Sequence, residues 1–309
     1  MMKHYLVTGG AGFIGSHLVD WLLQSGDRVT VLDDFSTGRR ENLSAQARLE
    51  VMTADVMEVE ARDFSGPFDG LVHLAALPSV NDSWTELRRA HDLNLTATLR
   101  VLELARALKI PRLVYASSAA VYGNPARIPV QESDATLPLS PYGLQKLAGE
   151  HYGRLLAAEG VLTFVALRFF NVFGPRQVAS SPYSGVISNF ADALRCDKRI
   201  TINGDGTQTR DFIYVTDVAR GINRALLAAN LAPFVVCNLG TGRAVSIREL
   251  AEMMRKNYPT WNGSIEMAPV PPGDIGQSQA STTAAKRVLD FQPEQSLEGG
   301  LAAMATAES

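Results

Sequence analysis

The fold of this chain is decided by the stretch Tyr5-Leu6-Val7-Thr8-Gly9-Gly10-Ala11-Gly12-Phe13-Ile14-Gly15, in which a short apolar run ends in a cluster of glycines. The apolar run predicts a buried strand, and the spacing of Ile14, Leu18 and Leu22 predicts a helix directly after it. Glycines let the backbone turn tightly and approach a pyrophosphate, while the start of a helix offers free N–H groups and a partial positive charge. Asp33 ends the next apolar run, about 20 residues further on, where a carboxylate can bind a ribose hydroxyl. The stretch therefore predicts a dinucleotide-binding turn, and Asp33 favours NAD over its 2′-phosphorylated form.

Short apolar runs and helix-like segments alternate through the first half of the chain. This alternation predicts the α/β class, with a Rossmann-type doubly wound parallel sheet covered by helices on both faces. After about residue 172 the pattern loosens, a helix resumes near Val215–Asn230, and the run Phe234–Leu239 is expected to return to the main sheet. We expect a cofactor-binding domain over residues 1–171 and about 207–262, and a smaller C-terminal substrate lobe over residues 172–206 and 263–309. The strands expected in the first half are Tyr5–Thr8, Arg28–Leu32, Leu49–Thr53, Leu71–Leu74, Arg112–Ser117 and Leu162–Arg168.

The composition limits the kinds of partner. The 309 residues are 46% hydrophobic with a formal net charge of −3, so we expect a substantial core and no basic surface for nucleic acid. Cys196 and Cys237 show no metal-ligand spacing, so neither a metal site nor a disulfide framework is expected. There is no signal-peptide pattern, and no run approaches the roughly 20 apolar residues that a membrane span needs. We therefore expect a cytoplasmic protein that does not bind membranes.

A phenol and an ammonium lie four residues apart in Tyr142-Gly143-Leu144-Gln145-Lys146, a spacing that places both on one face of a helix. A phenol has a reference pKa of roughly 10, which is too high for a base at neutral pH. A neighbouring lysine and a positively charged nicotinamide would lower the phenol pKa, so that Tyr142 could act as general base and acid. Ser117 and Ser118 follow the fifth expected strand, at the edge where open α/β sheets bind ligands. A serine at this edge can bond the reacting hydroxyl.

Further motifs stand at Thr8–Gly15, Asp33–Gly38, His73–Ala76, Ser117–Gly123, Ser140–Gly143 with Lys146, and Arg168–Pro175. Together, over nearly the whole chain, they resemble the extended short-chain dehydrogenase/reductase family, and within it the UDP-glucose/UDP-N-acetylglucosamine 4-epimerases. The resemblance implies that Ser118, Tyr142 and Lys146 are catalytic. It also implies tightly bound NAD, which takes a hydride from the sugar and returns it to the opposite face of a 4-keto intermediate.

The residues expected to bind ligands follow from the glycine turn and from this resemblance. For the UDP-sugar they are Ser117, Ser118, Asn171, Arg210, Asp274 and Ser278. For NAD they are Gly9, Gly12, Phe13, Ile14, Gly15, Asp33, Ser36, Thr37, Gly38, Asp55, Val56, Leu74, Ala75, Ala76, Tyr142 and Lys146.

The chain departs from the family pattern near its C-terminus, where an expected Arg-x-Gly-Asp segment reads Pro271-Pro272-Gly273-Asp274. The second phosphate-binding arginine is therefore absent from its usual place, and Arg176 is a candidate substitute. Ser118 is followed by Ala119-Ala120, where sugar 4,6-dehydratases carry Asp-Glu and UDP-glucuronate decarboxylases carry a Glu, so both reactions are disfavoured. A nucleotide-sugar 4-ketoreductase or a UDP-glucuronate 4-epimerase stays an alternative. A non-catalytic NAD sensor is a remote one, because such relatives usually lack the tyrosine or the lysine.

Ser278 bears on the substrate. In the epimerases that the chain resembles, this position borders the 2-substituent of the sugar, and a tyrosine there restricts turnover to UDP-glucose and UDP-galactose. The smaller serine leaves room for an acetamido group. We therefore expect interconversion of UDP-N-acetylglucosamine and UDP-N-acetylgalactosamine, with the non-acetylated pair as a further substrate.

The helix expected around His91–Leu108 carries two apolar stripes on nearly opposite sides. An ordinary surface helix carries one such stripe. One face would meet the sheet and the other a partner, so we expect a homodimer, although a neighbouring helix of the same chain could also cover the second stripe. The stripes are Leu95, Leu99 and Leu102, and Ala97, Val101, Leu104 and Leu108.

Overall fold

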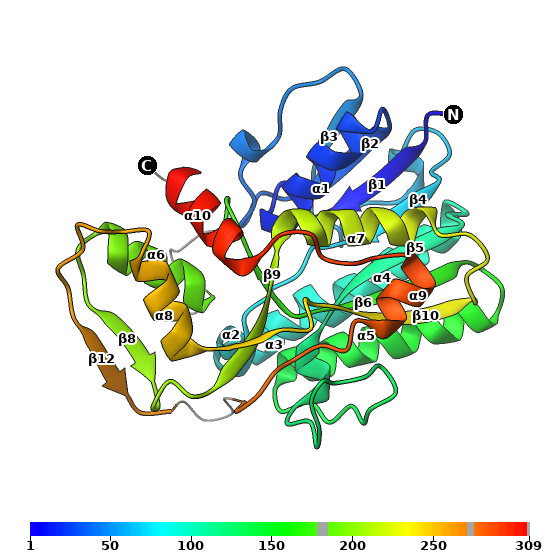
Figure 1. Cartoon of the computed structure of the whole chain (residues 1–309). Helices are drawn as coiled ribbons and strands as arrows, with labels where there is room; N and C mark the ends of the chain where they lie inside the picture. Colours follow the sequence, from blue (N-terminus) through cyan, green and yellow to red (C-terminus); the bar gives the residue numbers. More distant parts are fainter. Residues whose placement is uncertain (178–184, 271–274, 308–309) are drawn as a thin grey trace.

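The computed structural model describes residues 1–177, 185–270 and 275–307. Its centre is a seven-stranded parallel sheet with the strand order β10-β6-β5-β4-β1-β2-β3 (Figure 1). The expected strands of this sheet, including Phe234–Leu239, are confirmed to within one residue at each end. The strands are β1 (His4–Thr8), β2 (Arg28–Asp33), β3 (Leu49–Thr53), β4 (Gly70–His73), β5 (Arg112–Ser118), β6 (Thr163–Phe169) and β10 (Phe234–Leu239).

The strand order changes direction between β1 and β4. From β1 the chain first adds β2 and β3 on one side, and then adds β4, β5, β6 and β10 on the other side. At such a switch point the loops on either side diverge and leave a crevice beyond the carboxyl ends of the strands. The sheet therefore presents its ligand-binding edge at the ends of β1 and β4.

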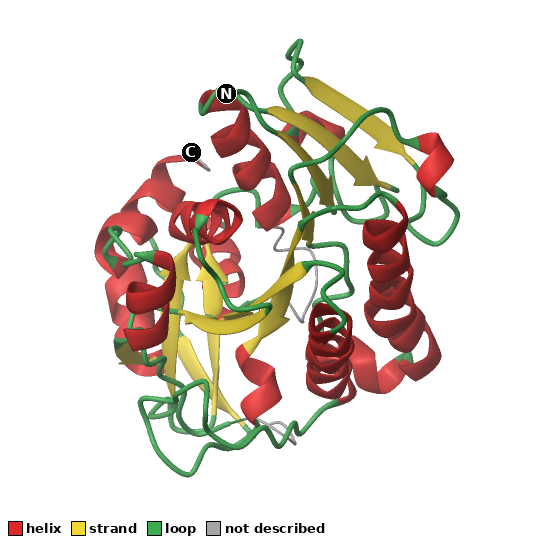
Figure 2. Cartoon of the chain, turned by 90° about the vertical axis from the view of Figure 1, so that its right-hand side faces the viewer, coloured by secondary structure: helices red, strands yellow, loops and turns green. Residues whose placement is uncertain are grey.

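Helices cover both faces of the sheet (Figure 2). Successive residues of β1 point to opposite faces, so that Tyr5 and Val7 pack into one hydrophobic cluster and Leu6 into another. The first cluster receives α1 (Phe13–Gln24), α7 (Val215–Leu227) and α9 (Thr283–Leu289), and the second receives α4 (Ala97–Ala107) and α5 (Pro141–Ala158). The doubly wound α/β fold is thus confirmed.

Shorter helical segments complete this part of the chain. Before α4 come α2 (Val80–Thr85), α3 (Leu87–His91) and the π-helical segment η3 (Asp92–Thr96). The 3-10 segments are η1 (Arg40–Asn42), η2 (Ala61–Asp63) and η4 (Ala119–Tyr122). Among the described helices, none is long and apolar enough to cross a membrane.

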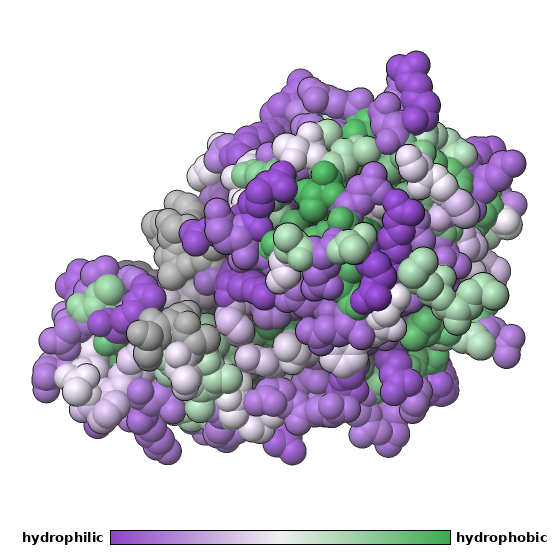
Figure 3. Space-filling model, turned by 90° about the horizontal axis from the view of Figure 1, so that it is seen from above, coloured by the Kyte–Doolittle hydropathy of each residue, from purple (hydrophilic) through white to green (hydrophobic). Residues whose placement is uncertain are grey.

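A smaller lobe projects from one side of the larger body, as Figure 3 shows from above. It contains a two-stranded sheet and the helices α6, α8 and α10, and a three-stranded sheet joins it to the main body. The two small sheets have the strand orders β12-β8 and β11-β9-β7. These elements are β7 (Asn171–Phe173), α6 (Val186–Arg195), β8 (Ile200–Asn203), β9 (Thr209–Tyr214), β11 (Ala244–Ser246), α8 (Ile247–Arg255), β12 (Ile265–Ala268) and α10 (Leu297–Ala307).

Packing departs from the expected domain boundaries at two helices. The range 207–262, expected in the cofactor domain, contains α8, whose Leu250 and Met254 pack into the cluster of the lobe with Ile202. The range 263–309, expected in the lobe, contains α9, whose Ala285 and Leu289 pack into the main core. The boundaries differ because the chain crosses between the two cores more often than its sequence pattern indicates.

Candidate functional site

The glycine turn lies between β1 and α1, at the switch point. Gly9 has a φ of +69°, and a Cβ there would lie 2.6 Å from the backbone nitrogen of Ala75 in the loop after β4. At Gly15 a Cβ would lie 2.1 Å from the carbonyl oxygen of Gly9. No described side chain caps α1, whose first turn also carries no acidic residue, so its first N–H groups face the turn without a side-chain partner. A closely approaching anion such as a pyrophosphate fits this turn.

A chain of hydrogen bonds joins the loops after β1 and β4. Thr98 Oγ1 donates to the carbonyl oxygen of Asn94 (2.6 Å), so it accepts from Nε2 of His73 (3.1 Å). Nδ1 of His73 is then the acceptor for the hydroxyl of Thr8 (2.8 Å). Burial, with a smaller contribution from Lys146, lowers the pKa of His73 to about 3, which keeps this imidazole neutral. This series of hydrogen bonds fixes the ends of β1 and β4. Gly9 follows β1, and the expected cofactor residues Leu74, Ala75 and Ala76 follow β4.

Asp33 ends β2 beside the glycine turn. Its carboxylate accepts hydrogen bonds from the backbone N–H groups of Ala11 (2.8 Å) and Phe35 (2.9 Å). Burial raises the pKa of Asp33, and these two bonds oppose the rise. A carboxylate can accept about four hydrogen bonds, so Asp33 keeps capacity for a ribose hydroxyl.

The other expected NAD residues lie at the ends of β2 and β3. The loop after Asp33 carries Ser36, Thr37 and Gly38, and a Cβ at Gly38 would lie 2.9 Å from Asp33 Oδ1. After β3, Asp55 accepts from the N–H of Met57 (2.8 Å), and Val56 is buried. The structure thus brings the expected cofactor residues of the first three strands to one edge of the sheet.

Ser118 and Tyr142 come from different elements and meet at this edge. Ser118 ends β5, and its hydroxyl accepts from the N–H of Ala120 (3.1 Å). Tyr142 lies in the first turn of α5, where its N–H donates to Ser83 Oγ (3.1 Å). Burial raises the pKa of Tyr142, and a hydrogen bond with the Ser118 side chain opposes that rise. The two hydroxyls are therefore placed to act on one reacting group.

Lys146 lies one turn further along α5. Its Nζ is 5.8 Å from the ring centre of Tyr142 and 5.1 Å from that of Tyr115, and the residue is 3% exposed. Burial alone lowers the pKa of Lys146 to about 8. We expected Lys146 to lower the pKa of Tyr142, but in the chain alone burial dominates and raises it. A buried ammonium needs polar partners, and the ribose hydroxyls of a dinucleotide fit that need.

Ser117, expected to contact substrate, has surroundings different from those of Ser118. It is 2% exposed and its hydroxyl donates to the carboxylate of Glu150 on α5. Neighbouring residues of a strand point to opposite faces, so Ser117 faces the helix layer while Ser118 continues into the loop. Sequence reasoning missed Glu150, although it follows Tyr142 and Lys146 at the i+8 and i+4 positions of the same helix face.

Arg210 and Ser278 lie close together in the lobe. Thr209, next to Arg210 on β9, donates its N–H to Gly276 (3.0 Å) and accepts from the N–H of Ser278 (3.1 Å). Ser278 is 5% exposed, so it is no surface residue. Asn171, in the neighbouring strand β7, is the register partner of Phe212. Asp274, also expected to bind substrate, lies outside the described residues.

Asp211 organises the loops around these residues, and sequence reasoning missed it. Its fully buried carboxylate accepts from Thr241 (N–H 2.7 Å and hydroxyl 2.6 Å), Gly242 (2.9 Å) and Ala280 (3.0 Å). It thereby ties β9 to the segment that contains Ser278. The signal was available as a charged residue in an otherwise apolar strand, Asp211-Phe212-Ile213-Tyr214.

Arg176 is the candidate substitute for the arginine that is absent at position 271. Its guanidinium forms an ion pair with Asp20 of α1 (2.8 Å). Asp20 uses Nη2 of Arg176, whereas Nη1 of Arg176 is buried without a hydrogen-bond partner among the described residues, so Arg176 as the substitute stays a prediction.

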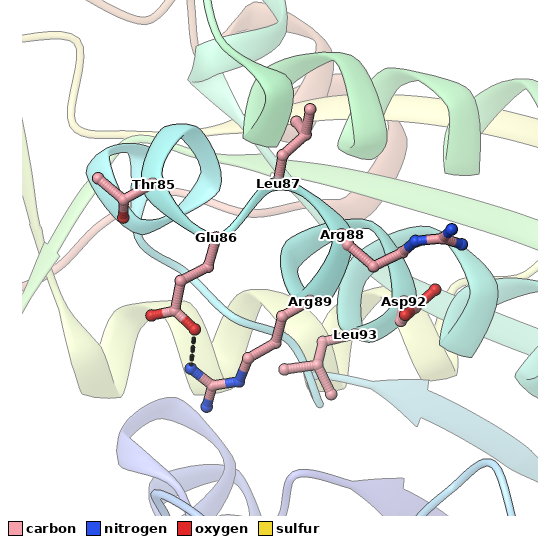
Figure 4. A pocket seen from close by; sticks show the side chains of 7 residues that line it. All are labelled: Thr85, Glu86, Leu87, Arg88, Arg89, Asp92 and Leu93. Atoms are coloured by element: carbon pink, nitrogen blue, oxygen red, sulfur yellow. Dashed lines mark hydrogen bonds and ion pairs between the residues drawn. The ribbon is translucent and has the colours of Figure 1, made fainter.

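A surface depression over α2, α3 and η3 contains none of the expected site residues. Figure 4 shows its lining on α2, α3 and η3, with an ion pair between Glu86 and Arg89 (2.7 Å) and with Leu87 pointing away from that pair. The candidate site is thus the sheet edge and the adjoining lobe. The lining residues are Thr85, Glu86, Leu87, Arg88, Arg89, Asp92 and Leu93.

Comparison with known proteins agrees with this geometry. Residues 5–240 match the model of the NAD dependent epimerase/dehydratase family. A UDP-glucose 4-epimerase of Mycolicibacterium smegmatis is 36% identical, with 96% of each chain covered.

Two solved structures are similar along nearly the whole chain. A UDP-N-acetylglucosamine 4-epimerase from Methanobrevibacter ruminantium M1, in complex with UDP-N-acetylmuramic acid, is 34% identical with a TM-score of 0.93 and covers 99% of this chain and 97% of that one. A UDP-glucose 4-epimerase from Thermotoga maritima, with UDP-glucose, is 33% identical with a TM-score of 0.92 and covers 98% and 97%. The chain belongs to the NAD dependent epimerase/dehydratase family.

Proposed function

We propose that this chain is a NAD-dependent UDP-sugar 4-epimerase, an isomerase. The observation that carries the proposal is the placement of Tyr142 and the buried Lys146 one turn apart on α5, with Nζ 5.8 Å from the centre of the phenol ring, beside Ser118 at the end of β5. Serine, tyrosine and lysine in this arrangement can hold a sugar hydroxyl and move its proton. The names of the relatives support the same reaction.

Each residue has a defined part in the proposed reaction. NAD, when bound, supplies the hydride acceptor at the sugar C4 and returns the hydride. Tyr142 removes the proton of the 4-hydroxyl and later gives it back, and Ser118 holds that hydroxyl. Lys146 binds the cofactor ribose and keeps a positive charge near the phenol.

The residues after Ser118 separate this function from others on the same scaffold. Ala119 and Ala120 form the start of η4, and the N–H of Ala120 binds Ser118 Oγ. Alanine side chains cannot move the protons that a dehydratase must transfer at neighbouring carbons. The arrangement therefore favours epimerisation, with a 4-ketoreductase as the second candidate because it needs the same three residues.

We further propose that the substrates are UDP-N-acetylglucosamine and UDP-N-acetylgalactosamine, bound between the cofactor domain and the lobe. The position of Ser278 beside the strand of Arg210 supports this proposal. A guanidinium binds phosphate oxygens in a fork, and a serine side chain leaves the space that an acetamido group requires.

The experiment incubates the purified protein, without added cofactor, with the N-acetylated pair, the non-acetylated pair and UDP-glucuronate, and follows each by NMR. We expect the N-acetylated pair to interconvert, and Ser278→Tyr to suppress this pair selectively. The matched control is Ser65→Tyr at an exposed loop position, which should change nothing. Turnover of only the non-acetylated pair or of UDP-glucuronate would refute the substrate proposal. Net consumption of added NADH would instead indicate a ketoreductase.

A further inference from the structure

A row of buried polar side chains crosses three neighbouring strands near their carboxyl ends. Ser117 on β5 is the register partner of Arg168 on β6, and Arg168 is the register partner of Asn238 on β10. The three residues are 2%, 5% and 0% exposed. Polar groups in a core are costly unless they are hydrogen-bonded, so the partners of the row indicate what it holds in place.

Glu150 of α5 binds two members of this row. Its Oε1 accepts from the Ser117 hydroxyl and from Arg168 Nε (2.9 Å), and its Oε2 accepts from Arg168 Nη2 (2.7 Å). The ion pair is thus bidentate and almost fully buried, with side-chain exposures of 6% for Arg168 and 3% for Glu150. Glu150 shares its helix face with Tyr142 and Lys146, so this network fixes the catalytic helix to β5 and β6.

The same row also holds the segment that follows Ser118. The guanidinium of Arg168 lies 4.7 Å from the ring centre of Tyr122 in η4. The Tyr122 hydroxyl donates to Asn238 Oδ1 (2.6 Å). One network therefore anchors both elements whose side chains meet in the site, α5 with Tyr142 and β5–η4 with Ser118.

We propose that Glu150, together with Ser117 and Arg168, is a positioning residue that holds the Tyr142 phenol against the Ser118 hydroxyl. This inference rests on the proposed function. The two hydroxyls come from separate elements, so their contact depends on how α5 sits on the end of β5. A misplacement of about 1 Å can reduce a rate about 100-fold. The three residues of the network are buried, and in this proposal they act through geometry.

Two variants test the proposal. Ser117→Ala removes one hydrogen bond and leaves the ion pair intact, and Glu150→Gln keeps the shape but removes the charge. Both should lower kcat by about 10-fold or more and leave KM nearly unchanged. The acid limb of the kcat–pH profile should move to higher pH, because the hydrogen bond with Ser118 opposes the rise that burial causes in the pKa of Tyr142. The titratable groups around Tyr142 are Lys146 on α5, Tyr115 on β5 and, beyond Lys146, His73 on β4. Ser117→Ala leaves all charges in place, whereas Glu150→Gln removes a negative charge that raises the pKa of Tyr115, so the pH profile is judged in Ser117→Ala.

The matched control is Asp217→Asn in α7, on the opposite face of the sheet. Asp217 forms a buried ion pair with Arg220 (2.7 Å) and accepts from the N–H groups of Glu294 (3.0 Å) and Gln295 (2.9 Å). This change breaks a comparable network, so it should lower stability but leave kcat and the pH profile unchanged. The proposal fails if Ser117→Ala and folded Glu150→Gln have the kcat and the pH profile of the wild type. It also fails if Asp217→Asn lowers kcat to the same degree. If Glu150→Gln does not fold, Ser117→Ala alone decides.

A second readout separates this proposal from the proposed function. A wild-type protein without epimerase activity would refute the function, but the Tyr142 phenol can still be titrated by NMR of tyrosine labelled with ¹³C at Cζ. Its signal is identified by its loss in Tyr142→Phe. We expect a higher phenol pKa in Ser117→Ala than in the wild type. Equal values would overturn the positioning role.

Discussion

At the residue scale, the proposed chemistry depends most directly on the phenol of Tyr142. Tyr142→Phe should lower kcat at least about 100-fold, because a phenyl ring carries no proton and general acid–base catalysis typically contributes 10²–10⁴-fold. Lys146→Ala should cause a comparable loss by removing the buried ammonium. Tyr152→Phe, on the exposed side of the same helix, is the control and should keep the wild-type rate. A folded Tyr142→Phe protein with more than about a tenth of the wild-type rate would contradict the assignment.

The motifs predicted which residue types gather at the site, but not every contact. The glycine turn follows β1 and Asp33 ends β2, so the apolar runs of these strands predict that both lie at one sheet edge. Tyr142 and Lys146 lie on α5 and are recognised by their helical spacing instead. Ser117 and Ser118 each carry a hydroxyl, so the sequence does not distinguish them. Their surroundings differ because of how β5 pairs with β6 and packs against α5. The partner of Arg176 could not be predicted either, because it depends on how the end of β7 folds back onto α1.

At the element scale, β1 and β4 are held together by the neutral imidazole of His73. Burial lowers its pKa to about 3, whereas an unfolded histidine titrates near 6.5. Below about pH 6.5 the unfolded state therefore binds a proton that the folded state does not, and stability falls as the pH falls toward 3. The slope should approach about 1.4 kcal/mol per pH unit.

Urea denaturation between pH 5 and 7 measures this slope in the wild type and in His73→Asn. The variant should be less stable overall but should lose less stability per pH unit. His4 and His17 also have lowered pKa values and contribute to the slope, but they are present in both proteins. An identical slope in the two proteins would show that His73 is not the group responsible.

The elements of the main sheet were predictable from local pattern, and those of the lobe were not. A strand buried on both faces is a continuous apolar run between turn residues, so its ends can be read closely from the sequence. The strands β8 and β12 of the lobe have four residues each, and α8 and α9 pack into different cores. Their assignment depends on long-range contacts that no local pattern contains.

At the scale of the whole molecule, the surface of α5 favours the predicted homodimer. Leu144, Tyr152 and Leu155 project from its outer side and are 58%, 43% and 60% exposed. On the neighbouring segment of η3 and α4, Ala97, Val101, Leu102 and Leu104 are buried within the chain. Leu95 and Leu99 on the same segment are half-buried. Only part of the first stripe is thus available to a partner, beside the exposed face of α5.

Light scattering at micromolar concentration should give the mass of a dimer for the wild type. Leu144→Glu combined with Leu155→Glu should give a monomer, because two charges would be buried in the interface. Met267→Glu replaces an equally exposed apolar side chain in the lobe and should leave the dimer intact. A monomeric wild type would contradict the prediction.

The central claim is that the reaction is a redox-neutral inversion at C4 of the sugar. The most direct measurement uses a UDP-N-acetylhexosamine with deuterium at C4, incubated with the purified protein in ordinary water and without added nicotinamide. We predict that the C4 epimer forms and keeps its deuterium at C4, because the hydride that leaves this carbon returns to it from the opposite face. Loss of the label to solvent, or a product that forms only with added NADH, would contradict the account.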